Sequence, residues 1–561
     1  MRRKFLVIFL LVLGVSAFFL TKDLFLPHVK KTGKNPPPVT EQKPFVIIIP
    51  SYNNEKYVEK NLRSVFTQNY QNYRVIYVSD NSRDETLENA KALLTDLDKV
   101  GRATLIHNPI NCGALANIYN AVHSCHDKEI VVLLDGDDFF AHENVLNILN
   151  QTYADPNVWM TYGNYLDYPT YKQEPQICKK LPENVIVKRS FRNSPCVTTH
   201  LRTFYASLFK EIRISDLFFR GRFYSMGWDL AIMLPLLEMS APRIAYIEDV
   251  LYLYNRGNPI SDHKLNLAFQ RKCHVDIYKK SQYLTLHHLP RQLMQKHSAD
   301  LVVFSENNPM QLFALLESVD QNVTGLGNTT VFYHAKNSEL ESHYLEIKLE
   351  FPKVQFLKIE DNFKILLNTI AFDSPLSESK YILFAKDSLI VKDQLDLTKA
   401  ISSLEISQAY SLHFSHHQNL TFSKELDRHL PLPPATPLRG IASGEVPFAW
   451  QFSAGTDDWN TPRHFSFALY RKEDIQKSLE NLDFASPSSL EYQWTEHIPQ
   501  EEIGLFYADA KCAFLEPAPH LSKRALSEKF EEGLKIDLNP LFQAQTPSQE
   551  ISTDLSFISR F

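Results

Sequence analysis

Four consecutive residues, Asp135-Gly136-Asp137-Asp138, carry the clearest chemistry in this sequence. They follow an apolar run, so the carboxylates of Asp135 and Asp137, two residues apart at the end of a strand, would point to the same side of the chain. Such hard oxygen ligands suit Mg²⁺ or Mn²⁺, and diphosphate oxygens can complete the coordination shell. The cation would neutralise charge that develops on a leaving nucleotide diphosphate. The alternative is an acidic turn, since Asp-Gly is a common turn dipeptide.

The elements around this cluster alternate between apolar runs and segments with helical periodicity. Helical spacing recurs, for example, at Val58, Leu62 and Val65. Four strands that alternate with helices over about ninety residues predict an α/β fold with a doubly wound parallel sheet. In such sheets, ligands bind at the carboxyl ends of the strands. The expected strands are Phe45–Ile49, Val75–Val78, Thr104–Ile106 and Ile130–Leu134, and each is followed by polar residues.

Four sequence segments occur in one order at consistent spacing: FVIIIPSYNN (45–54), VSDNSRDET (78–86), NCGALAN (111–117) and VVLLDGDD (131–138). Together they resemble the family 2 glycosyltransferases, which are inverting enzymes with the Rossmann-like GT-A fold. The resemblance extends over about residues 45–254. It implies a metal-dependent glycosyltransferase that moves a hexosyl or related sugar, with inversion, from a nucleotide-diphosphate donor to an acceptor hydroxyl. Asn81 departs from the family, which often has a second Asp there.

The same resemblance implies roles for several residues that bind the donor. Pro50, Tyr52 and Glu55 would lie around the nucleotide, and Asp80 would bind the base or ribose, while Asp135 and Asp137 would hold the metal. Two of these residues have a structural alternative: Glu55 can be a solvated acid at a helix start, and Asp80 can form an Asx turn. Asn111 and Gly113 would offer an amide and backbone N–H groups to a phosphate or sugar at a helix entry, or they can simply cap the helix.

An inverting transfer also needs a base to deprotonate the acceptor hydroxyl. The resemblance points to Asp229, which precedes a helix, with Trp228 beside it to stack on a sugar. The family usually has an acidic pair there, and Trp228 replaces its first member. Asp229 can instead cap the helix. Arg202 would hold a phosphate of the donor or acceptor, or it is a surface residue.

A second copy of the first strands and helices is expected about 250 residues later. Residues 301–308 (LVVFSENN) parallel residues 47–54, and residues 381–388 (YILFAKDS) fall where the acidic cluster falls in the first copy. Here Ala385 and Ser388 replace two of the aspartates, and only Asp387 remains. We therefore expect a degenerate GT-A-like domain over residues 298–520, after a GT-A domain over 44–290. Residues 521–561 are expected to form a loosely held polar tail.

The amino terminus combines a basic start with the apolar run Phe5–Leu20. We expect residues 1–26 to form a single-pass membrane helix, or alternatively a cleaved signal peptide, followed by a stem over 27–43. The catalytic part would lie on the cytoplasmic face in a bacterium and in the Golgi lumen in a eukaryote. An anchored enzyme of this kind suits a lipid, glycan or protein acceptor.

The net charge of −6 argues against a partner that is a nucleic acid. Two other functions compete with a transferase. A non-catalytic carbohydrate-binding or scaffold protein with decayed transferase folds would explain the second copy, but not the intact Asp135–Asp138 cluster. A nucleotidylyltransferase would have a loop rich in glycine and lysine after the first strand, whereas residues 51–55 are Ser-Tyr-Asn-Asn-Glu.

Overall fold

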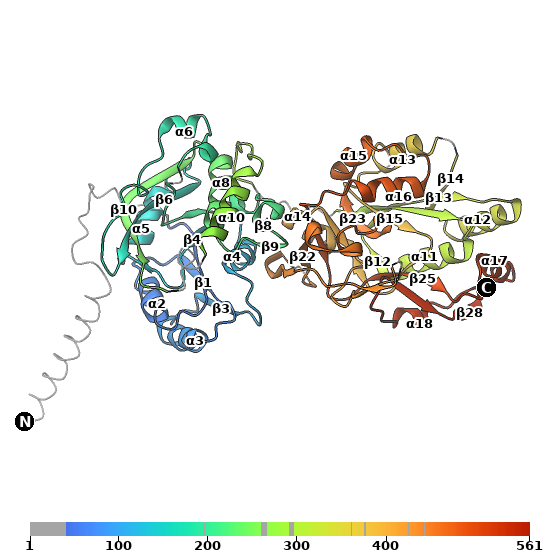
Figure 1. Cartoon of the computed structure of the whole chain (residues 1–561), viewed down its shortest axis with the longest axis horizontal. Coiled ribbons are helices and arrows are strands. Elements are labelled where there is room, and N and C mark those ends of the chain that lie inside the picture. Colours follow the sequence, from blue (N-terminus) through green and yellow to red (C-terminus); the bar gives the residue numbers. More distant parts are fainter. Residues whose placement is uncertain are drawn as a thin grey trace, which may run out of the picture. The chain divides into compact units, whose positions relative to one another are not determined.

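The computed structural model describes residues 41–195, 197–259, 266–290, 297–360, 362–374, 377–424, 426–441 and 444–560. The chain divides into two compact units, Met1–Ile212 with Phe223–Leu293 and Arg213–Arg222 with Met294–Phe561. Figure 1 colours the first unit from blue to green and most of the second from yellow to red. The domains expected over 44–290 and 298–520 fall almost entirely within these two units.

The expected membrane helix over residues 1–26 lies outside the described residues, as does nearly all of the stem over 27–43. Among the helices that the structure does describe, none is long and apolar enough to cross a bilayer. The anchor therefore stays a prediction from the sequence.

A mixed sheet forms the centre of the first unit. Its strands are β1 (Phe45–Ser51), β2 (Tyr73–Ser79), β3 (Ala103–His107), β4 (Ile130–Leu133), β5 (Phe139–Phe140), β6 (Met160–Tyr168), β7 (Thr203–Tyr205) and β10 (Ile244–Asn255). They lie in the order β3-β2-β1-β4-β7-β6-β10-β5. The first four are parallel, as the buried apolar runs predict. Because β7 is antiparallel to both β4 and β6, the expectation of a wholly parallel sheet is wrong beyond β4.

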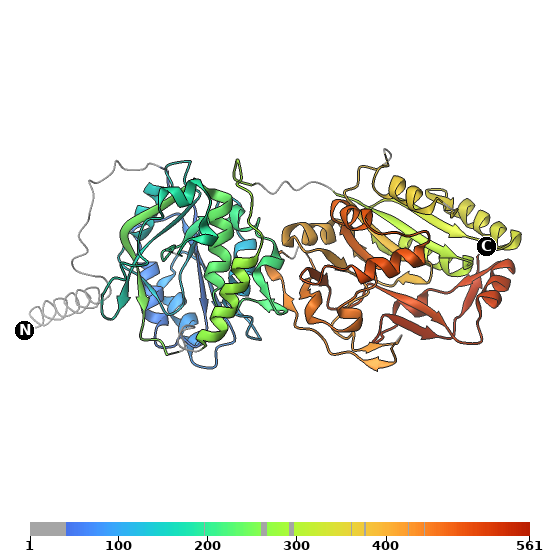
Figure 2. The same cartoon turned by 45° about the horizontal axis from the view of Figure 1, so that its top comes forward.

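The helices of the first unit pack around this sheet. They are α2 (Val58–Phe66), α3 (Thr86–Leu97), α4 (Ala114–His123), α5 (Val145–Thr152), α6 (Glu183–Val187), α7 (Ala206–Phe209), α8 (Trp228–Ser240) and α10 (Leu267–Lys279), with a 3₁₀ turn at Phe191–Asn193. Helix α8 is buried along almost its whole length, which suits its continuous apolar sequence. Figure 2 shows the green helices α8 and α10 side by side, and residues of the two helices are in contact.

A second mixed sheet forms the centre of the second unit. Its strands are β11 (Ala299–Glu306), β13 (Leu326–His334), β14 (Val354–Lys358), β15 (Tyr381–Lys386), β18 (Ser411–His413), β21 (Thr436–Pro437), β22 (Phe448–Gln451), β23 (Ser466–Arg471) and β24 (Ile503–Phe506). Their order is β14-β13-β11-β15-β23-β18-β24-β22-β21. The first four strands are parallel, β23 is antiparallel to both of its neighbours, and β18 and β24 are parallel. Strand for strand, this is the path of β3-β2-β1-β4-β7-β6-β10 in the first unit, where β6 and β10 are also parallel.

The helices of the second unit flank this sheet, and Figure 2 shows the yellow helix α12 running along the neighbouring strands. They are α11 (Pro309–Asn322), α12 (Ser338–Glu350), α13 (Phe363–Ala371), α14 (Leu397–Ser407), α15 (Lys472–Glu480), α16 (Pro487–Glu496), α17 (Lys523–Glu531) and α18 (Asn539–Phe542). Shorter strands are β8 (Phe218–Phe219), β9 (Arg222–Phe223), β12 (Val323–Thr324), β16 (Leu389–Val391), β17 (Leu395–Asp396), β19 (Phe422–Ser423), β20 (Arg428–His429), β25 (Cys512–Pro517), β26 (Leu534–Ile536), β27 (Glu550–Thr553) and β28 (Phe557–Ser559).

The expectation of a loosely held polar tail over residues 521–561 is wrong. Strand β27 pairs in parallel with β25, and β26 pairs with β28. Leu526 and Phe530, four residues apart on α17, are both buried. A few apolar residues at the spacing of a helix face therefore fix this segment, although its average composition is polar.

Candidate active site

The polar ends of β1, β2, β3 and β4 meet at one edge of the first sheet, as their parallel pairing requires. Main-chain hydrogen bonds join the loops: Asp80 N–H donates to the carbonyl of Ser51 at 2.9 Å, and Gly136 N–H donates to that of Pro50 at 3.1 Å. Asn108 N–H likewise donates to the carbonyl of Ser79 at 3.0 Å. The four sequence segments that predicted a site are thus brought together.

The three aspartates of the acidic cluster lie in different environments. Asp135 and Asp137 are half-buried, whereas Asp138 is buried. Asp138 accepts hydrogen bonds at 2.6 Å from the Tyr252 hydroxyl and from the main-chain N–H of Asn255. Burial and the nearby charges of Asp137 and Asp135 raise the pKa of Asp138 well above its usual range. Asp138 therefore holds the loop to β10, and Asp135 and Asp137 are the carboxylates with access to a ligand.

Amide side chains fix the acidic loop in place. Asn61 on α2 donates through Nδ2 to the carbonyl oxygens of Asp135 and Asp138, at 3.0 and 2.8 Å. Asn258, in the segment after β10, donates to Asp137 Oδ2 at 2.6 Å. A Cβ atom on Gly136 would lie 2.5 Å from the Oγ of Ser51, so the loop can approach β1 this closely only with glycine.

Asp80 is buried and binds the loop before α4. Its carboxylate accepts hydrogen bonds from Asn108 Nδ2, Cys112 N–H and Gly113 N–H at 2.8–2.9 Å. Asn111 Nδ2 donates to the main-chain carbonyl of Asp80 at 3.1 Å. Asp80, Asn111 and Gly113 are thus brought together, but they satisfy one another. Their direct contact with a nucleotide, phosphate or sugar stays a prediction.

The three residues expected around the nucleotide lie on β1 and in the loop that follows. Pro50 is buried within β1, while Tyr52 and Glu55 are half-buried. Glu55 precedes α2 and accepts a hydrogen bond at 3.2 Å from the main-chain N–H of Glu85, so it links the loops after β1 and β2. Glu55 thus lies just before the helix and not in its first turn, and its hydrogen bond is exposed to solvent. Its contact with a nucleotide stays a prediction.

Asp229 and Arg202 form an ion pair. Arg202 Nη2 donates to Asp229 Oδ2 at 2.9 Å, and the two side chains are 9% and 40% exposed. Arg202 is therefore not a surface residue, and it contacts the predicted base. The N-cap of α8 is Gly227, in a left-handed conformation with φ of 68°, and Trp228 and Asp229 are the first two residues of the helix. Asp229 is thus not the N-cap residue, and Trp228, half-buried, lies directly beside it.

Two aromatic residues connect this ion pair to the acidic cluster. The ring of His200 stacks on that of Tyr252, with ring centroids 4.3 Å apart, and it approaches Arg202 Nη1 at 3.5 Å. The Tyr252 hydroxyl donates to Asp138 and accepts from Asp135 N–H at 3.3 Å. Burial, with a smaller contribution from Arg202, lowers the pKa of His200 well below its usual range, so the ring is neutral.

Sequence reasoning did not find Tyr252 or Asn258. Tyr252 lies in an apolar run that predicts a buried strand, so its hydroxyl does not stand out as a polar group with a role. Asn258 is a single polar residue in a loop. The sequence contains no spacing that would have distinguished either one.

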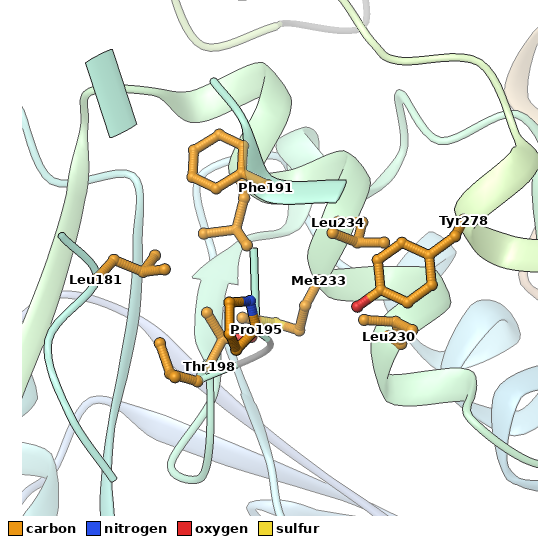
Figure 3. Close-up of a pocket in the computed structure, with 10 residues that line it drawn as sticks. Leu181, Phe191, Pro195, Thr198, Leu230, Met233, Leu234 and Tyr278 are labelled. Atoms are coloured by element: carbon orange, nitrogen blue, oxygen red, sulfur yellow. The ribbon is translucent and has the colours of Figure 1, made fainter. Parts of the chain in front are cut away.

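An apolar pocket lies beside this site but does not suit a charged donor. Figure 3 shows Leu181, Phe191, Leu230 and Tyr278 around it, and Met233 and Thr198 also line it. Its walls offer no carboxylate or amide side chain. In the part of the chain that the structure describes, no group of three or more His, Cys, Asp or Glu side chains is arranged to hold a metal. A site that uses two carboxylates and the diphosphate of a donor does not require such a group.

Comparison with known proteins agrees with this geometry. Residues 46–213 match the model of glycosyl transferase family 2. Residues 46–213 therefore form a family 2 glycosyltransferase domain. The glycosyltransferase GlyG of Streptococcus pneumoniae is 25% identical over 248 residues, which cover 42% of this chain and 78% of GlyG. An uncharacterized glycosyltransferase of Haemophilus influenzae is 33% identical over 119 residues, 21% of this chain and 46% of that protein. The protein is therefore a glycosyltransferase.

Solved structures resemble part of the glycosyltransferase. Residues 1–349 of S. aureus TarS are 18% identical, with a TM-score of 0.32 over 43% of this chain and 67% of that one. The mannosyltransferase PcManGT of Pyrobaculum calidifontis, solved in complex with GDP-Man and Mn²⁺, is 19% identical, with a TM-score of 0.32 over 44% and 66%.

Proposed function

We propose that the first unit transfers a sugar from a nucleotide-diphosphate donor to an acceptor hydroxyl, with inversion and with help from a divalent cation. The observation that carries this proposal is the pair of half-buried carboxylates, Asp135 and Asp137, at the carboxyl end of β4. In α/β sheets this edge is where ligands bind. The second unit, whose sheet follows the same path, is proposed to be a degenerate GT-A-like domain.

The donor set at the acidic cluster fits Mg²⁺ or Mn²⁺. Asp135, Asp137 and Asp138 crowd negative charge into one short loop, and the charges of the first two disfavour ionisation of the third. Hard carboxylate oxygens are the ligands that these cations prefer. Asp135 and Asp137 would hold the cation, which when bound supplies charge stabilisation to the leaving diphosphate. Asn61 and Asn258 keep the loop oriented.

Asp229 is proposed as the base that deprotonates the acceptor hydroxyl. It is 40% exposed, so an acceptor can reach it, while Arg202 fixes its orientation. Trp228 offers an aromatic face to a sugar beside it. Pro50, Tyr52, Glu55 and Asp80 are proposed to shape the nucleotide side, Asp80 by holding Asn111 and Gly113 in place.

We further propose that residues 1–26 anchor the enzyme in a membrane through a single pass. The similar proteins come from Streptococcus pneumoniae and Haemophilus influenzae, which favours the cytoplasmic face, where a bacterium holds its nucleotide sugars. The acceptor would be a lipid, a glycan or a protein near that face.

The test is Asp137→Asn, assayed with a panel of nucleotide sugars and with Mn²⁺ or Mg²⁺. Loss of the second carboxylate should lower transfer roughly 10³-fold or more, because several kcal/mol of charge stabilisation disappears. Calorimetry should show that donor binding no longer depends on the cation. Asp96→Asn, at an exposed position on α3, is the matched control and should behave like the wild type. Near-normal transfer by a folded Asp137→Asn protein would overturn the metal site.

A further inference from the structure

One face of the first unit combines exposed apolar and basic side chains. On α10, Arg271, Val275 and Lys279 are spaced four residues apart and therefore form one stripe. All three are exposed, and Val275 is 55% exposed despite its apolar side chain. Within the described residues, neither Arg271 nor Lys279 forms an ion pair, so both charges face solvent.

The end of α6 and the segment after α10 extend this face. Val187 is 72% exposed and Leu284 is 82% exposed, and Lys188 is exposed next to Val187. Gln282 Nε2 donates to the carbonyl of Arg189 at 2.8 Å, which brings the two segments together. Leu181 and Phe191, on either side of α6, line the same pocket as Tyr278 of α10, as Figure 3 shows. We call Val187, Lys188, Arg271, Val275, Lys279 and Leu284 the basic-apolar face.

Two acids near this face, Glu238 and Asp276, are bonded to partners within the first unit. Glu238 is fully buried and accepts from Arg192 Nε at 2.6 Å, and Asp276 bonds to the hydroxyl of Tyr224 and pairs with Lys280. Single exposed apolar residues are ordinary on a protein surface. Here several exposed apolar residues lie among basic residues that form no ion pair within the described part of the chain, and Glu183, at the start of α6, is the one fully exposed acid described in these segments. Such a combination is typical of a surface that binds a partner.

We infer that the basic-apolar face docks on an anionic lipid surface. Lysine and arginine are attracted to acidic headgroups, and apolar side chains between them gain free energy by entering the boundary between headgroups and acyl chains. A partner that is only polyanionic would attract the basic side chains, but it would leave the apolar side chains of Val187, Val275 and Leu284 exposed to water. The net charge of the whole chain is −6, so the attraction arises from this face and not from the protein as a whole.

The first test is binding of the full chain to phosphatidylcholine vesicles with increasing phosphatidylglycerol. The variant Lys188→Gln/Arg271→Gln/Lys279→Gln removes three charges, and Lys91→Gln/Lys99→Gln/Lys128→Gln removes three exposed charges elsewhere on the unit as a control. Each basic residue near such a surface strengthens binding roughly fivefold. The affinity of the first variant for vesicles that contain phosphatidylglycerol should therefore be at least about tenfold lower than that of the wild type, whereas the affinity of the control should be unchanged. The first forty residues are common to all three proteins, so they cannot cause the difference.

The second test asks whether the apolar residues enter the lipid. Leu284→Trp should be quenched by brominated lipid in vesicles that contain phosphatidylglycerol, and Val100→Trp, 69% exposed on the same unit, should not. Equal dependence on phosphatidylglycerol in the two charge variants would overturn the inference. So would an unquenched Leu284→Trp, which would instead indicate a soluble polyanion as the partner of the cations.

Discussion

At the scale of single residues, three neighbouring aspartates have separate tasks because their surroundings differ. Asp138 is buried against Tyr252 and Asn255, whereas Asp135 and Asp137 remain half-buried. Types and spacing alone predicted the cluster but not this division, since it depends on β10, more than a hundred residues later. The sequence identifies the three aspartates, but only the fold shows that Asp138 has a structural role.

The ion pair of Asp229 allows a sharp test of the proposed base. Asp229→Asn keeps the size of the side chain and a hydrogen bond to Arg202, but an amide cannot take a proton from the acceptor. We expect transfer to fall roughly 10²–10⁴-fold, while the donor dissociation constant stays unchanged because the base touches only the acceptor. Steady-state kinetics and donor calorimetry on the same protein measure the two quantities.

Asp216 provides the comparison, because it also follows the cluster and pairs with an arginine, Arg213, at 3.2 Å. Asp216→Asn should leave transfer per folded molecule close to that of the wild type. If Asp229→Asn turns over normally while it is folded, Asp229 is not the base.

At the scale of elements, Asp80 fastens the end of β2 to the loop that begins α4. Asp80→Asn replaces one acceptor oxygen by an NH₂ group that faces N–H donors, so at least one of its three hydrogen bonds is lost. The loss should destabilise this loop by about 1.5–3 kcal/mol. Hydrogen–deuterium exchange of residues 108–117 should rise, and the donor KM should rise with it. Unchanged exchange in this loop would mean that the bonds do not hold it.

The sequence predicts those parts of the fold that depend on neighbouring residues, and it does not predict those that depend on distant contacts. The strands β1, β2, β3 and β4 follow from continuous apolar runs, and their shared edge follows from parallel pairing. The antiparallel strand β7 cannot be predicted in this way, because three residues are too few to show an alternating pattern of apolar and polar side chains. Tyr252 and Asn258 complete the site only because β10 returns beside the acidic loop. Such contacts join positions more than a hundred residues apart, and no local pattern encodes them.

At the scale of the whole molecule, a cluster of buried histidines should make the second unit sensitive to acid. Burial lowers the pKa of His416 and of His464 to about 3, and it lowers that of His413 well below its usual value. In the unfolded chain each pKa is near 6.5. The unfolded state therefore binds more protons below pH 6.5, and the free energy of unfolding falls as pH drops from 6.5 towards 3.

Between pH 6.5 and 5 the loss should be up to about 2 kcal/mol for each histidine. Hydrogen–deuterium exchange as a function of pH should reveal it in peptides with His413, His416 and His464. His464→Gln should reduce the loss, whereas His429→Gln, at an exposed position, should not. A pH-independent stability of these peptides over that range would contradict the expectation.

The difference between the acidic residues of the two units predicts how many nucleotide-sugar donors one molecule binds. Asp387 is the aspartate of the second unit that corresponds to the acidic cluster, and it is buried. It accepts hydrogen bonds from Ser305 Oγ, Glu306 N–H and Asn308 Nδ2 at 2.9–3.1 Å. These bonds occupy both carboxylate oxygens, and Ala385 and Ser388 supply no other carboxylate. We therefore expect metal-dependent donor binding in the first unit alone.

Calorimetry of the full chain with a nucleotide sugar and Mn²⁺ should give one site per molecule. Asp137→Asn should abolish that site, because the first unit holds the cation. Asp387→Asn should keep it, because Asp387 supports only the packing around Ser305 and Asn308, although the thermal stability of the second unit should fall. Two sites per chain in the wild type, or one remaining metal-dependent site in Asp137→Asn, would instead identify the second unit as a working transferase. The hydrogen bonds around Asp387 would then have to open when the donor binds.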